Sequence, residues 1–140
     1  MEYFEAINRL MDDYIAEVRN ILSNLRLCDG IFGMGNDPKK NPCHMNFYYE
    51  LEKLVASSVS SEPTEEDAFA SAELLIKAPD EKACAPVARC TLVATRKMAI
   101  QFIPYLTAEH KDELKRWFDD NVPRRTRMPI EKDVYDALEN

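Results

Sequence analysis

The chain has 140 residues, a formal net charge of −7, 46% hydrophobic residues and 31% charged residues. This is the length of one domain, enough to bury about two thirds of the unfolded surface without disulfides or metals, and the composition excludes general disorder. No apolar run approaches the roughly 18 residues of a membrane span, and the acidic surface disfavours nucleic acid and anionic membranes as partners.

The distribution of glycine predicts the fold class. Only three glycines occur, and they lie close together at Gly30, Gly33 and Gly35. A β-sheet protein needs glycine at many of its turns, whereas helices can be connected through Pro, Asn, Asp and Ser. We therefore predict an all-α fold, a single-domain bundle of five to six helices over residues 1–140.

The first helix is expected over residues 2–28. Its apolar residues are spaced alternately three and four apart and form one stripe: Phe4, Ile7, Met11, Tyr14, Val18, Ile21, Leu25 and Cys28. Asp29 and Gly30 end this helix, and a loop over 29–41 follows. The stripe also fits the heptads of a coiled coil, but its width favours one helix of a bundle.

The second helix is expected to begin at Asn41 and Pro42. Asn41 is a favourable N-cap, and the fixed φ of Pro42 suits the first helical position. The helix should run to about Ser58, before a polar link over 57–63. Its predicted apolar face consists of Met45, Phe47, Tyr48, Leu51, Leu54 and Val55.

Prolines separate the third and fourth helices. Thr64 is expected to cap a helix over about 65–77 that Pro79 stops. The next helix, over 87–103, is apolar on most faces, which is typical of a central helix, and Pro104 closes it. The residues expected to be buried in this central helix include Cys90, Val93, Ala94 and Met98.

The C-terminal part predicts two more helices around a basic connector. Thr107 is expected to cap a helix over 108–120, and Pro129 starts the last helix after the connector over 121–129. The predicted inward residues of these two helices are His110, Leu114, Trp117, Phe118, Ile130, Val134, Tyr135 and Leu138.

Residues 30–44 are the predicted functional surface. A loop of this length in a compact helical domain is often functional, and it holds every glycine of the chain. The glycine spacing fits neither a P-loop nor a dinucleotide-binding motif. The candidate ligand- or partner-binding residues are Phe32, Met34, Lys39, Lys40, Asn41, Cys43 and His44. In the alternative, Phe32 and Met34 merely plug the end of the bundle.

The cysteines are expected to be inert thiols rather than metal ligands. Cys28, Cys43, Cys84 and Cys90 lack the paired spacing of a structural zinc site, so neither a metal nor a cofactor is predicted. The N-terminal residues do not resemble a signal peptide, which indicates the cytoplasm, where disulfides are rare. Cys43 looks the most reactive, because a helix N-terminus lowers the pKa of a thiol.

The basic connector offers a third candidate site. Arg124, Arg125 and Arg127 could clamp phosphates or acidic side chains. The favoured interpretation is a solvated loop that pairs with Asp119 and Asp120.

The sequence shows no specific catalytic constellation, so a non-enzyme is favoured. We expect a small acidic cytoplasmic protein that acts as a non-catalytic protein-interaction module, with another protein as its partner. The alternative is a helical protein that binds a metal or small ligand through the glycine-rich loop at 30–44. A third hypothesis is a nucleic-acid accessory factor that depends on the arginines.

Overall fold

The computed structural model describes residues 2–24, 38–82 and 88–140. The helices, including three short 3₁₀ helices (η), are in chain order α1 (Glu2–Ser23), η1 (Pro38–Lys40), α3 (Cys43–Ser60), α4 (Glu65–Lys82), α5 (Ala88–Ala99), η2 (Ile103–Tyr105), α6 (Ala108–Asn121), η3 (Arg124–Thr126) and α7 (Pro129–Glu139). No strand occurs in these residues, and the predicted all-α bundle is confirmed.

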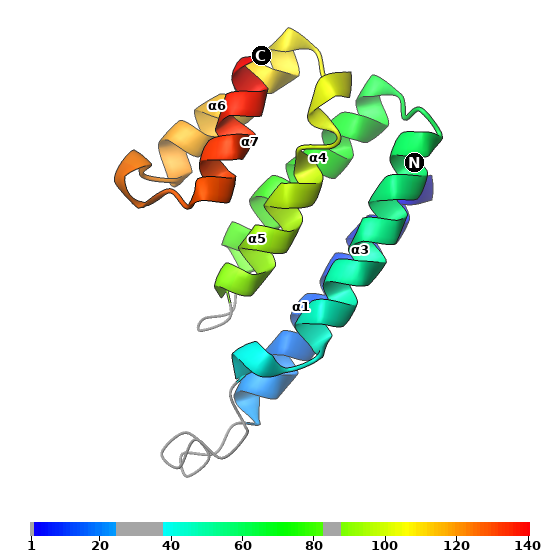
Figure 1. The fold of residues 1–140 in the computed structure, drawn as a ribbon, viewed down its shortest axis with the longest axis vertical. Coiled ribbons are helices and arrows are strands. Elements are labelled where there is room, and N and C mark those ends of the chain that lie inside the picture. The colour runs from blue at the N-terminus through cyan, green and yellow to red at the C-terminus, as the bar shows by residue number, and fades with distance from the viewer. Residues whose placement is uncertain (1, 25–37, 83–87) are drawn as a thin grey trace.

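Four helices form a closed ring, and a helical hairpin packs beside it. α1 packs against α3 and α4, while α5 packs against the other sides of α3 and α4. α1 and α3 run in opposite directions as one hairpin, and α4 and α5 form the second (Figure 1). α6 and α7 pack against each other, and α7 also packs against α5. Helix α5 therefore has neighbours on three sides and takes the predicted central position.

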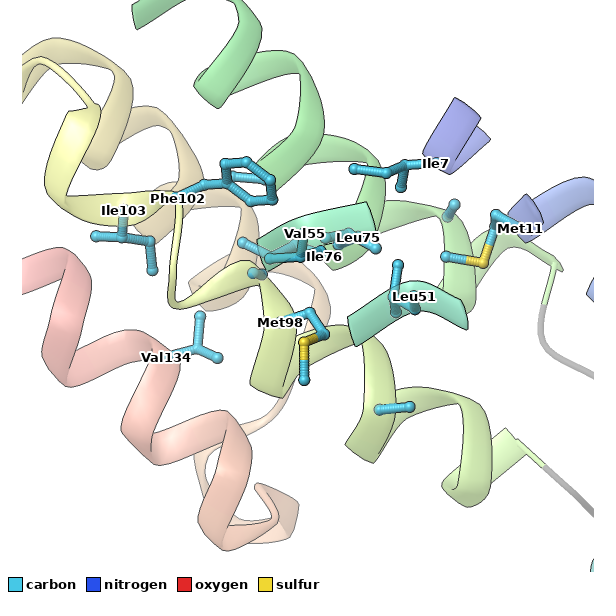
Figure 2. Packing of buried hydrophobic residues seen from close by; sticks show 14 of the residues in the cluster. Ile7, Met11, Leu51, Val55, Leu75, Ile76, Met98, Phe102, Ile103 and Val134 are labelled. Atoms are coloured by element: carbon cyan, nitrogen blue, oxygen red, sulfur yellow. The ribbon is translucent and has the colours of Figure 1, made fainter. Parts of the chain in front are cut away.

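The core lies between the helices of the ring and extends under α7. Figure 2 shows Met11 and Ile7 of α1 near Leu51 of α3, and Met98 of α5 on the side toward Val134 of α7. All five of these side chains are at most 1% exposed. Their burial follows from the apolar stripe that each helix carries at helical spacing.

Two prolines act differently from the prediction. Helix α4 continues through Pro79 to Lys82, although proline lacks the N–H that would bond to the carbonyl of Leu75. The guanidinium of Arg96 donates to the neighbouring carbonyl of Ile76 at 3.3 Å, so packing against α5 stabilises this turn. Helix α5 ends at Ala99, well before Pro104, because a proline clashes with the carbonyl four residues earlier.

The faces of α3 and α5 also differ from the prediction. Met45 and Val93 were expected to be buried, but they are 56% and 42% exposed. Cys90 is only half-buried, whereas Ala94 and Met98 are buried as expected. The central helix is not apolar on all sides, because it buries Thr91, Thr95 and Arg96.

The predicted helix starts are confirmed at Thr64, Thr107 and Pro129, whereas α3 begins at Cys43 with Pro42 as its N-cap, one residue later than predicted. The Oγ1 of Thr107 accepts the backbone N–H of His110 at 3.2 Å, and the Oγ1 of Thr64 accepts that of Asp67 at 3.1 Å. Asn41 accepts the N–H of Cys43 at 2.9 Å. The part of the predicted first helix at 25–28 lies outside the described residues.

Candidate interaction site

The described part of the predicted functional surface lies at the N-terminal end of α3. Lys39 and Lys40 are exposed in η1, and Asn41 and His44 are half-buried. Cys43 is buried. Phe32 and Met34 lie outside the described residues, as do the glycines of the loop.

A buried tyrosine connects this end of α3 to α1 and α5. The hydroxyl of Tyr14 lies 2.7 Å from Nδ1 of His44 and 3.1 Å from Oγ1 of Thr91. Its ring stacks on Phe47 with the centroids 4.0 Å apart. His44 is the second residue of α3 and Thr91 the fourth of α5, so the two helices start at the same end of the bundle.

Cys43 does not have the character of a reactive thiol. Burial raises its pKa, and the neighbouring Glu17 and Cys90 raise it further. The Sγ of Cys43 lies 3.8 Å from Nδ1 of His44, but the same nitrogen faces the hydroxyl of Tyr14. The expected lowering of this pKa is therefore wrong, because desolvation outweighs the backbone hydrogen bond that lowers it.

Three large apolar side chains on α3 and α5 are exposed and are together called the apolar patch: Met45, Tyr49 and Val93. Met45 and Tyr49 are one turn apart on α3 and are 56% and 53% exposed. Val93 is on the adjacent helix α5. Within the described ranges these three are the large hydrophobic residues with clearly exposed side chains. Their placement on neighbouring helices is typical of a surface that binds a partner.

A contact between α3 and α5 shows which residues of the two helices lie at the same height along the bundle. The ammonium of Lys97 donates to the hydroxyl of Tyr48 at 2.7 Å and lies 5.3 Å from the centre of its ring. Because both helices start at the same end, the residues one turn earlier, Met45 and Val93, are also at one level. The rim of the patch therefore carries the exposed cation of Lys97.

Sequence reasoning missed this patch because it placed Met45 and Val93 in the core and left Tyr49 unassigned. The buried stripe of α3 runs instead through Cys43, Phe47, Leu51 and Val55, in steps of four. Tyr49 and Met45 fall about 160° away from the centre of that stripe, given 100° per residue. The sequence of α3 therefore contains two alternative apolar stripes, one through Phe47 and Leu51 and one through Met45 and Tyr49.

The described residues do not form a metal site. No group of three or more His, Cys, Asp or Glu side chains within residues 2–24, 38–82 and 88–140 is placed to hold a metal ion. Cys43 and Cys90 are free thiols. Cys28 and Cys84 lie outside the described residues.

The arginine connector is only partly the predicted solvated loop. Arg127 is 5% exposed in its side chain and donates to the carbonyls of Val122 and Phe118. It also pairs with Asp119 at 3.3 Å, as does the exposed Arg124 at 3.7 Å. The pairing with Asp119 agrees with the prediction, but Arg127 mainly satisfies backbone carbonyls at the end of α6.

In comparisons with known proteins, no family model, curated protein or solved structure matched this chain. Among the helices that the structure describes, none has both the length and the apolar character needed to cross a bilayer.

Proposed function

We propose that this chain is a non-catalytic protein-interaction module that binds an amphipathic helix of another protein. The observation that carries the proposal is the apolar patch of Met45, Tyr49 and Val93 on two neighbouring helices. An amphipathic helix commonly binds through its apolar face to an exposed apolar surface of another protein.

The surroundings of the patch indicate which partner fits. A partner helix would place apolar side chains one turn apart over Met45 and Tyr49. Lys97 at the rim and Lys40 near the start of α3 favour acidic residues next to those apolar ones. The raised pKa of Cys43 and the lack of a described metal-ligand cluster give no support to catalysis at the same place.

A pair of charge variants tests the proposal. Met45→Glu with Tyr49→Glu places two carboxylates in the patch, and both side chains are already exposed, so folding should be preserved. Asn46→Glu with Ser57→Glu adds the same charge at exposed positions of α3 outside the patch. Tagged wild-type and variant proteins are used for affinity capture, and captured proteins are identified by mass spectrometry.

The expected partner is captured by the wild type and by N46E/S57E but not by M45E/Y49E. The purified partner should then bind the wild type in calorimetry, with an affinity at least about tenfold above that for M45E/Y49E. Equal capture by wild type and M45E/Y49E, or no specific protein with either, would contradict the proposal. Lys97→Gln should weaken binding less than the double variant, because a rim charge contributes less than buried apolar contact.

A further inference from the structure

A second surface lies on α7, at the side of the molecule away from α3. A groove runs between η3 and α7, and its lining residues are Arg124, Arg127, Lys132, Tyr135, Asp136 and Glu139. The buried face of α7 carries Glu131, Val134 and Leu138. Apart from Tyr135, which contacts α6, the lining residues of α7 lie outside this buried face.

The charges in this groove are separated along the helix. Lys132, Asp136 and Glu139 share one face, because they are spaced four and three residues apart. The guanidinium of Arg124 lies 5.8 Å from the centre of the Tyr135 ring, in the middle of the groove. One end of the groove is therefore cationic and the other anionic, about 10 Å apart at 1.5 Å per residue.

The middle of the groove is held rigidly. Arg127 stacks over the ring of Tyr135 at 4.7 Å while its guanidinium bonds to backbone carbonyls at the end of α6. The hydroxyl of Tyr135 donates to Asp119 at 3.2 Å. Arg127 is thus engaged within the molecule. Arg124 pairs with Asp119 at 3.7 Å, but its side chain is 75% exposed, and Lys132 and Glu139 are also exposed.

We propose that this groove binds a second copy of the chain, with the two α7 helices antiparallel across a twofold axis near Tyr135 and Asp136. A twofold axis places the cationic end of one groove opposite the anionic end of the other. Lys132 then faces the partner subunit's Glu139, and Arg124 faces the partner subunit's Asp136. Each contact occurs twice, so the surface is complementary to itself.

Charge also argues against other occupants of this groove. A phosphate backbone would meet the carboxylates of Asp136 and Glu139, which repel it. A peptide of one sign of charge would satisfy only one end. Because exposed ion pairs contribute little individually, the dimer is expected to be weak and to form at high protein concentration.

A charge exchange between two variants tests the proposal. Arg124→Glu with Lys132→Glu leaves Arg127 as the remaining cation of the groove, and Asp136→Lys with Glu139→Lys makes the groove wholly cationic. Arg9→Glu with Arg19→Glu is the control for R124E/K132E, because it changes the net charge equally at exposed positions of α1. Sedimentation equilibrium from about 0.01 to about 1 mM protein covers the affinities of weak dimers. Circular dichroism confirms that each variant is folded.

The wild type and R9E/R19E should associate with increasing concentration. Each groove variant alone should associate at least about tenfold more weakly, because like charges then face each other. An equimolar mixture of R124E/K132E and D136K/E139K should form a heterodimer at least as tight as the wild-type dimer. A monomeric wild type at about 1 mM, unchanged association of R124E/K132E, or a mixture that stays monomeric would overturn the proposal.

Discussion

The attachment of α7 to the bundle should depend on one buried ion pair. Arg96 of α5 is fully buried, and the side chain of Glu131 of α7 is 6% exposed. The guanidinium of Arg96 donates to the carboxylate of Glu131 and to the carbonyl of Ile76 in α4. The other carboxylate oxygen of Glu131 accepts the backbone N–H of Met128 at 2.8 Å. Glu131→Ala therefore removes a buried counter-charge and a helix cap together.

The expected cost follows from these two losses. Removing one partner of a buried ion pair typically costs about 3–5 kcal/mol, because the interaction between the two buried charges is lost. Loss of the cap at Met128 adds about 1 kcal/mol. The total of about 4–6 kcal/mol is a large part of the roughly 5–15 kcal/mol that stabilises a typical domain. A chain of this length should lose about 15–20 °C in Tm.

Urea unfolding followed by circular dichroism measures this cost, and two further variants separate its parts. Glu131→Gln removes the charge but keeps an oxygen for the N–H of Met128, so it should cost about 1 kcal/mol less than Glu131→Ala. Arg96→Met combined with Glu131→Leu replaces the pair by apolar side chains and should recover most of the stability. If the free energy of unfolding of Glu131→Ala is within about 1 kcal/mol of the wild-type value, the ion pair does not stabilise the attachment of α7 and the reasoning is refuted.

Three other predictions follow from the described contacts. Ala94→Asp should cost about 3 kcal/mol or more in urea unfolding, whereas Val93→Asp, on the exposed face, should stay within about 1 kcal/mol of the wild type. The hydrogen bond that His110 donates to the carboxylate of Glu65 raises the pKa of His110 above its usual 6.5, and desolvation opposes this rise. Desolvation raises the pKa of Glu65, but the hydrogen bonds from His110 and from the backbone N–H of Thr107 together lower it below 4.5. The contribution of this pair to stability is therefore greatest between pH 4.5 and 6.5. It is lost as the pH rises through the pKa of His110 or falls through the pKa of Glu65. An NMR titration of His110 that is unchanged in Glu65→Gln would contradict this. Because burial raises its pKa, Cys43 should be alkylated at neutral pH at least about tenfold more slowly in the native than in the urea-unfolded protein, and equal rates would show that the thiol is accessible.

The helix starts were predictable because their signals are local. Thr64, Thr107 and Pro129 each begin a helix where the sequence predicted one. A cap depends on a side chain and the backbone within three residues, so neighbouring residues are sufficient to specify it. The helix ends were less predictable, since α4 passes through Pro79 with a contact from Arg96 of another helix.

The candidate site was predictable only in its position along the chain. The start of α3 was singled out from Asn41, Cys43 and His44, and the apolar patch lies next to it. The patch itself needed the fold, because whether Met45 is buried depends on which side of α3 meets α1 and α5. Helical spacing alone allowed either stripe to face inward.

The sequence by itself determined that this chain is a bundle of amphipathic helices, since periodicity, caps and the scarcity of glycine are properties of neighbouring residues. Only the tertiary structure decided which polar groups are buried. Arg96 and Glu131 are 35 positions apart and have no local signal, yet each is buried because the other compensates its charge. Tyr14, His44 and Thr91 likewise meet only because three helices converge. Contacts of this kind join residues that are far apart in the sequence, so composition and local spacing do not predict them.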